Sequence, residues 1–410
     1  MASYRDITNE LVTPFTGRPE AQYLAHALGS FASIRLQEVP HEVRMHASGH
    51  PWIRVRFRPR THCVKSVEIE SSDSTEIGQY VDGVREQLAG AAEAIYPFTA
   101  FTARPVCGTF VSASNQLCIQ QAHRDHPRPA FEMGEHPCTL YTTYARFPNS
   151  EEISRVAREQ RARQCTLLLN AFTHGMRLRD PYGQHDYAIV VRGGSPICEY
   201  VQLDYWAWHV VPDSMPTCGF GEAIPEVGEQ TYFSPSLQAA ALWPYTEFSI
   251  PDTLNDLFAM FTSSSDELQT RFLRACHWLH MSADVSAGND DLRMVCLATG
   301  IEALLPEPAS GTCSLCKKPS GPGPTRLFRD FVNEYMHELA TDKRFASLVY
   351  DLRSKIVHGS YIVGDGVPWL MPFGGQYNSD DQLIRSFYRG LRLAMVRWLR
   401  SEAANESQSS

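Results

Sequence analysis

The sequence predicts an α+β domain over residues 1–250, an all-helical bundle over residues 251–402 and a disordered tail over residues 403–410. The length of 410 residues supports two domains, because a single core of that size is uncommon. Strand-like and helical patterns alternate before Pro251, whereas almost every later pattern is helical. Pro251 and the potential capping residue Asp252 are typical of a boundary at this point.

The first domain is predicted to mix strands and helices. Residues 52–57, WIRVRF, alternate with a period of two and predict a strand, while apolar residues recur at helical spacing over residues 75–95. Asn149 and Ser150, followed by two glutamates, predict the N-terminus of a helix that reaches about residue 173. Further strands are expected at residues 63–70, 109–113, 117–121, 139–147, 186–192 and 198–211.

The second domain is predicted to be a bundle of amphipathic helices joined by short turns. Each helix carries an apolar face that must pack against its neighbours. The helices are expected at residues 252–263, 266–283, 289–305, 325–340, 343–358 and 380–401. The final residues, AANESQSS, are small and polar, so a disordered end is expected.

Composition limits the classes of function. The eleven cysteines follow no regular framework, and most lie in apolar stretches, which favours reduced thiols over disulfides. The net charge of −9 argues against a broad basic surface, so any contact with RNA must use a local patch. The first residues resemble no signal peptide and no long apolar run follows; a cytoplasmic protein without membrane association is therefore expected.

Two groups of cysteines and histidines contain residue types that bind zinc. Cys313 and Cys316 form a CxxC pair in a loop rich in Pro and Gly, and Cys276 and His280 are spaced to share one helical face and complete a structural zinc site. The alternative is a loop with two free thiols. The second group has no recognisable ligand spacing and is better explained by a polar loop; it comprises Cys118, His123, His126, His136 and Cys138.

The stretch DLRSKIVHG at residues 351–359 contains the main candidate for catalysis. The spacing of Arg353 and His358 is common by itself, and its setting is more informative. An apolar stripe anchors the helix over residues 343–358, and Gly359 is suited to end it. On an α-helix His358 lies about 140° round from Arg353, so a long arginine side chain can approach the imidazole.

These residues resemble the HEPN family (higher eukaryotes and prokaryotes nucleotide-binding), and within it the Apea-like branch. The family signature is an arginine, four to six intervening residues and a histidine, which Arg353 and His358 match. The helix LRMVCLATGIEALL, about fifty residues earlier, also agrees, and Glu302 matches the family's recurring glutamate. Ser354 departs from the Asn, Asp or His that often follows the arginine. The resemblance covers about residues 252–401.

The resemblance implies a HEPN-type bundle that acts as a metal-independent endoribonuclease. In the family, a homodimer places the Arg and His of both protomers in one cleft, and the products carry a 2′,3′-cyclic phosphate and a 5′-hydroxyl. Residue chemistry is compatible, because histidine transfers protons near neutral pH and arginine holds two phosphate oxygens. No cofactor is required for this catalysis.

Several residues near the motif are candidates for contact with RNA. Arg385, Arg389 and Arg392 recur at spacings of four and three, which predicts a basic stripe on one helical face, and Lys355 lies within the motif. A solvated helix face is the alternative. Tyr361 is suited to stack on a base, or to pack after the turn.

The predicted function is a ribonuclease effector of prokaryotic antiviral defence or a toxin. By analogy, the first 250 residues sense an unknown ligand or protein trigger, or restrain the nuclease. The alternatives are a non-catalytic HEPN module that binds RNA, nucleotide or protein, and a helical dimerisation domain. A zinc-dependent nuclease is disfavoured, because no Asp, Glu and His set has suitable spacing.

Overall fold

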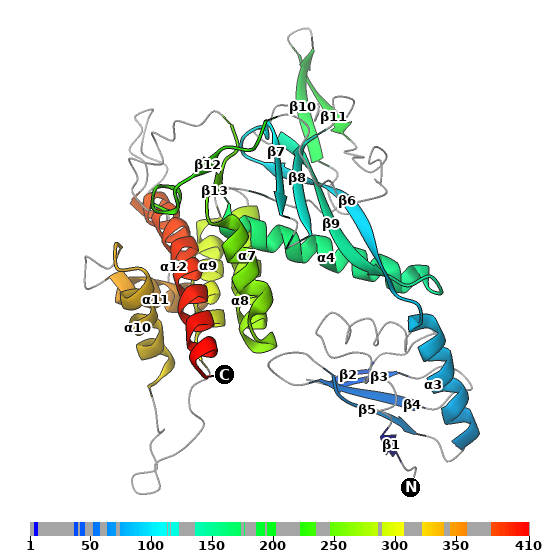
Figure 1. Cartoon of the computed structure of the whole chain (residues 1–410). Helices are drawn as coiled ribbons and strands as arrows, with labels where there is room; N and C mark the ends of the chain where they lie inside the picture. Colours follow the sequence, from blue (N-terminus) through cyan, green and yellow to red (C-terminus); the bar gives the residue numbers. More distant parts are fainter. Residues whose placement is uncertain are drawn as a thin grey trace, which may run out of the picture.

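A computed structural model gives the fold of the chain. It describes residues 4–6, 37–39, 42–45, 52–57, 64–70, 74–112, 114, 116–122, 136–173, 176, 186–192, 195–201, 222–234, 247–285, 289–306, 322–339, 345–358 and 379–409. The described residues form a mixed α/β region with antiparallel sheets, followed by a helical C-terminal part (Figure 1).

The first sheet has five strands in the order β1-β5-β4-β3-β2, and neighbouring strands are antiparallel. Its strands are β1 (Tyr4–Asp6), β2 (Gln37–Val39), β3 (Glu42–Met45), β4 (Trp52–Phe57) and β5 (Val64–Glu70). β4 pairs with β5, and Val67 and Ile69 on β5 are fully buried. The two strands predicted around residues 52–70 are therefore confirmed.

The predicted helix at residues 75–95 was too long at its C-terminal end. Helix α3 (Ser74–Leu88) ends two residues before Gly90, whose φ of +71° is the left-handed conformation that often terminates helices. Residues 92–95 instead begin strand β6 (Ala92–Thr102), which pairs with another strand along its whole length. Ala, Glu and Ile at residues 92–95 fit the spacing of a helix as well as that of a strand. The local pattern therefore did not indicate that the helix ends and a strand begins.

The second sheet has the order β6-β9-β8-β7 and is covered by a long helix. Strands β7 (Thr109–Ser112), β8 (Leu117–Gln121) and β9 (His136–Arg146) agree with the predicted positions, and β9 begins three residues early. Helix α4 (Glu151–Phe172) packs against β9 and β6 (Figure 1). Its cysteine Cys165 lies 3.5 Å from the Thr142 hydroxyl on β9.

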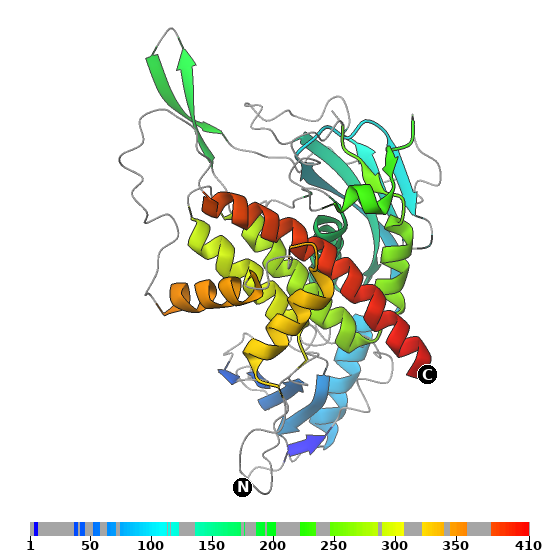
Figure 2. The same ribbon diagram turned by 90° about the vertical axis from the view of Figure 1, so that its left-hand side faces the viewer.

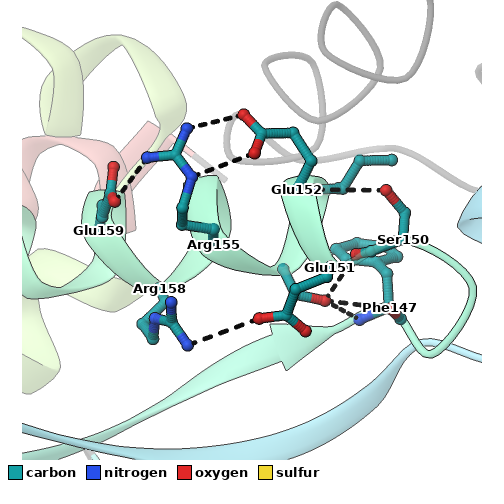
Figure 3. A network of polar contacts seen from close by, with 9 residues as sticks. Phe147, Ser150, Glu151, Glu152, Arg155, Arg158 and Glu159 are labelled. Atoms are coloured by element: carbon teal, nitrogen blue, oxygen red, sulfur yellow. Dashed lines mark hydrogen bonds and ion pairs between the residues drawn. The ribbon is translucent and has the colours of Figure 1, made fainter. Parts of the chain in front are cut away.

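The N-terminus of α4 has the predicted cap. The Ser150 hydroxyl accepts a hydrogen bond from the Ile153 amide at 3.3 Å. Figure 3 shows Arg155 between Glu152 and Glu159, with a closest distance of 2.7 Å to each carboxylate. These side chains are largely exposed, so their ion pairs add little stability.

Two short strand pairs complete the first part. β10 (Asp186–Arg192) and β11 (Ser195–Val201) form an antiparallel hairpin, so the second strand begins before the predicted residue 198. The predicted continuation over residues 202–211 lies outside the described residues. β12 (Glu226–Val227) pairs in parallel with β13 (Ile250–Pro251), and helix α5 (Glu229–Tyr232) follows β12.

All six predicted helices of the C-terminal part are present among the described residues. They are α7 (Leu254–Ser263), α8 (Asp266–Asp284), α9 (Asp290–Leu304), α10 (Pro324–Tyr335), α11 (Phe345–Val357) and α12 (Ser379–Ser409). Helix α12 packs against α7, α8, α9 and α10 (Figure 2). Among the described helices, none has the length and apolar character that a membrane span requires.

The predicted disordered tail at residues 403–410 is wrong, because α12 continues through it to Ser409. The Glu406 carboxylate accepts hydrogen bonds from the amide of Ser265, at 3.0 Å, and from its hydroxyl. Ser265 is the N-cap of α8, where amide groups and the helix dipole favour a negative charge. This long-range contact gives a physical reason for helical order at the end.

The hydrophobic core does not divide at the predicted boundary after residue 250. One cluster of buried residues includes the second sheet, α4 and the C-terminal helices. The Phe172 ring of α4 lies 5.4 Å from Phe258 and 5.6 Å from Phe272, and Phe272 stacks on Trp398 of α12. Helix α4 therefore connects the sheet to the helical part through aromatic packing.

Candidate functional site

Helices α9 and α11 bring Glu302 and Arg353 together. Phe345, Ala346 and Val349 bury one face of α11, and Leu304 helps to bury α9. This packing places Arg353 Nη2 3.0 Å from Glu302 Oε2, so the guanidinium donates a charge-assisted hydrogen bond to a helix that is distant in the sequence.

The ion pair between Arg353 and Glu302 is partly exposed to solvent. The Arg353 and Glu302 side chains are 27% and 30% exposed, respectively. Arg353 Nε is buried and has no hydrogen-bond partner among the described residues. A guanidinium has five N–H donors, and among the described residues Glu302 accepts a hydrogen bond from Nη2 of Arg353.

His358 lies directly after the last residue of α11, and its side chain is exposed. Its backbone amide donates to the carbonyl of half-buried Ser354 at 3.0 Å, which continues the helical hydrogen bonding by one residue. Arg353 and His358 are thus carried by the same helix end. Gly359 and Tyr361 lie outside the described residues.

Exposed apolar side chains occur on the same helices. Leu348 and Val357 of α11 are 52% and 53% exposed, and Leu292 of α9 is 44% exposed. These values are high for large aliphatic residues, which usually contribute to a core or an interface. The surface of α11 therefore combines the candidate residues with apolar area.

The four predicted RNA-binding cations occupy different environments. Lys355, in the last turn of α11, and Arg385 of α12 are exposed, whereas Arg389 is half-buried. Arg392 is only 1% exposed, so the predicted basic stripe on α12 is wrong at this position. The four cations do not form one exposed surface.

Arg392 has a structural position at the C-terminus of α4. Its Nε donates to the Ala171 carbonyl at 3.3 Å, its Nη2 donates to the Thr173 carbonyl, and its guanidinium lies 5.8 Å from the centre of the Phe233 ring. Helix α4 has no basic residue in its last turn, and a cation is favourable there. The periodicity of α12 did not reveal these acceptors.

Two of the four predicted zinc ligands, Cys276 and His280, lie among the described residues. Cys276 is fully buried in the core, where burial raises its pKa well above the ordinary value. His280 Nε2 lies 3.0 Å from Asp284 Oδ2. Cys313 and Cys316 lie outside the described residues, and the described part contains no group of three or more His, Cys, Asp and Glu side chains suited to a metal.

The second Cys and His grouping also contains sheet-core residues. Cys118 on β8 and Cys138 on β9 are both fully buried, and burial raises the pKa of each thiol to about 12. His136 begins β9 and is half-buried, whereas His123 and His126 lie outside the described residues. The two cysteines therefore contribute to packing as neutral thiols.

A cavity between α7, α8 and α12 was not anticipated from the sequence. It has a volume of about 670 Å³ and is lined by residues that include Ser264, Arg400 and Glu406. Both charged residues already have partners, since Arg400 pairs with Glu229 and Glu406 with Ser265. Residues at the end of α12 form one wall of the cavity. Because the sequence predicted a disordered tail there, it did not predict the cavity.

The chain was compared with known protein families, curated proteins and solved structures. No protein-family model, curated protein or solved structure matches the chain.

Proposed function

We propose that the chain is a metal-independent endoribonuclease of the HEPN type, with Arg353 and His358 as its catalytic residues. One observation carries the proposal: a partly exposed arginine is held by Glu302 and shares a helix end with an exposed histidine. The resemblance of DLRSKIVHG and GIEALL to the family supports it. The proposed role is an effector of prokaryotic antiviral defence or a toxin.

The proposed chemistry is cleavage by the ribose 2′-hydroxyl. His358 takes the hydroxyl proton, and the 2′-oxygen forms a bond to phosphorus while the bond from phosphorus to the 5′-oxygen breaks. A second imidazolium returns a proton to the leaving 5′-oxygen, which yields a 2′,3′-cyclic phosphate and a 5′-hydroxyl. Arg353 donates to the non-bridging oxygens, where negative charge develops.

The need for both a base and an acid favours a homodimer. A single imidazole cannot hold and lack a proton at the same moment, so a second copy would supply the acid. Leu348 and Val357 expose apolar area on the helix that carries Arg353, which a second copy would cover. The dimer is part of the proposal.

The decisive experiment compares RNA cleavage by the wild type, Arg353→Ala and His358→Ala in the presence of chelator. We expect chelator-resistant cutting that leaves a 2′,3′-cyclic phosphate and is lost in both variants. Arg329→Ala, which removes an exposed arginine from α10, is the matched control and should retain activity. Cutting that persists in both site variants would rule out this assignment.

The second candidate is a non-catalytic HEPN module that binds RNA or nucleotide, or mediates dimerisation. The hydrogen bond between Arg353 and Glu302 favours it, since such a pair can serve only to join two helices. Growth on expression separates the candidates. The ribonuclease should arrest growth and His358→Ala should relieve the arrest, whereas a binding module would give equal growth in both.

A further inference from the structure

Arg389 has an unusual environment on α12. It is half-buried, and its Nη1 atom is buried with no hydrogen-bond partner among the described residues. Buried guanidinium donors nearly always have an acceptor, because removing an N–H group from water without replacing its hydrogen bond is unfavourable. Within the described part of the chain, Arg389 Nη1 therefore lacks an acceptor.

Two neighbouring positive charges make the half-buried Arg389 guanidinium less favourable. Arg385 and Arg392 lie four residues before and three residues after Arg389, which are neighbouring positions on a helix. Burial, followed by the charges of Arg385 and Arg392, lowers the pKa of Arg389. An anion beside Arg389 would supply the acceptor and oppose the repulsion among the three guanidinium groups.

The three arginines contribute differently. Arg392 is turned to the carbonyl groups at the end of α4 and is fully buried, so it supplies positive potential but no accessible donor. Arg385 is exposed one turn away from Arg389. Arg389 and Arg385 can thus approach one ligand, Arg389 from a half-buried position and Arg385 from solvent.

We propose that Arg389 and Arg385 form a phosphate-binding site that holds one phosphodiester of a single-stranded RNA. Phosphate suits the position, since its non-bridging oxygens accept two parallel hydrogen bonds from a guanidinium. The Phe387 ring of α12 lies 6.2 Å from the Phe345 ring at the start of α11, so the two helices are in contact at this point. The choice of RNA as the ligand rests on the proposed function. The inference that an anion binds beside Arg389 does not depend on that function.

The first test uses thermal unfolding with inorganic phosphate as the probe. Without phosphate, Arg389→Gln should match or exceed the wild-type melting temperature, because the change removes a guanidinium whose buried Nη1 has no acceptor among the described residues. Phosphate should raise the melting temperature of the wild type and have a smaller effect on Arg389→Gln. A variant that melts lower and retains the full effect of phosphate would overturn the site.

The second test measures binding of a labelled single-stranded RNA in the His358→Ala background, so that cleavage does not interfere. Arg389→Gln should weaken binding about tenfold and lower the slope of log affinity against log salt by about 0.7, as for loss of one phosphate contact. Arg329→Gln, an exposed change on α10, should alter binding little. Unchanged RNA affinity in Arg389→Gln would overturn the RNA assignment, even if phosphate stabilises the protein.

The two proposals fail in different ways. If the chain binds RNA through Arg389 but cuts none, the ribonuclease is wrong and the phosphate site stands. If Arg353→Ala abolishes cutting while Arg389→Gln binds RNA like the parent protein, the ribonuclease stands and the phosphate site is wrong.

Discussion

Arg353 Nη2 on α11 donates to Glu302 Oε2 on α9 at 3.0 Å, across 51 positions of sequence. The pair joins the candidate arginine to a helix whose neighbouring residues, Ile301 and Leu304, are fully buried. The Glu302 carboxylate restricts the rotamers of Arg353, which under the proposed function would position the guanidinium before RNA binds.

Glu302→Gln should therefore lower RNA cleavage without removing a catalytic group. Glutamine has nearly the same shape but no charge, so Arg353 is held less firmly. We expect a loss of about tenfold in kcat/KM, or ~1.4 kcal/mol of transition-state stabilisation. Stability should fall by only about 1 kcal/mol, because the pair is partly exposed.

A double-mutant cycle with Arg353→Lys tests whether Glu302 acts through Arg353. If it does, the double variant should lose less activity than the two single losses predict together. Glu334→Gln, on an exposed part of α10, provides the comparison and should leave cleavage near the wild-type rate. Full additivity in the cycle would contradict a positioning role.

Local patterns predicted the helices that carry the candidate site. The helical periodicity of α11 and the cap at Ser150 depend on residues within a few positions, so the sequence reveals them directly. The predicted apolar stripe is buried only in part, because Leu348 and Val357 are exposed. The hydrogen bond between Arg353 and Glu302 depends on how α9 and α11 pack. Only the resemblance pointed to Glu302, and neither spacing nor periodicity indicated its contact.

The failures of sequence analysis have the same physical origin. Arg392 fits the spacing of an exposed stripe, but its acceptors lie at the C-terminal end of α4, 219 and 221 positions away. Glu406 lies in a polar end that resembles a disordered tail, but its partner Ser265 is 141 positions away. Long-range acceptors for polar side chains cannot be read from local patterns.

Arg392→Met should destabilise the fold by about 2–3 kcal/mol, because it leaves two buried carbonyl groups at the end of α4 without their donor. Methionine retains much of the side-chain length, which limits the effect of lost packing. Urea unfolding measures the change in unfolding free energy. Arg385→Met, on an exposed part of the same helix, should change it by less than about 0.5 kcal/mol.

His277 should make stability depend on pH. Burial, followed by the charges of Arg163 and His280, lowers its pKa below the ordinary histidine value. The unfolded chain therefore binds the proton more readily. The contribution to stability is complete above about pH 6.5 and is lost as pH falls through the folded-state pKa.

His277→Asn should remove this part of the pH dependence. The measurement is the unfolding free energy of the wild type and the variant at a series of pH values between neutral and mildly acidic. The difference between the proteins should change with pH below about 6.5 and be constant above it. The exposed His337→Asn variant serves as a control. A constant difference at every pH would show that His277 does not contribute.

Deletion of residues 405–410 should destabilise the protein, although these residues look dispensable in the sequence. The deletion removes Glu406, whose carboxylate accepts from the amide and hydroxyl of Ser265 at the start of α8. Loss of such a contact at a helix N-terminus costs about 1 kcal/mol. Glu406→Ala should reproduce most of the loss in urea unfolding, while Ser407→Ala, an exposed neighbour, should not. If the deletion and Glu406→Ala both leave stability unchanged, the end of α12 does not hold α8.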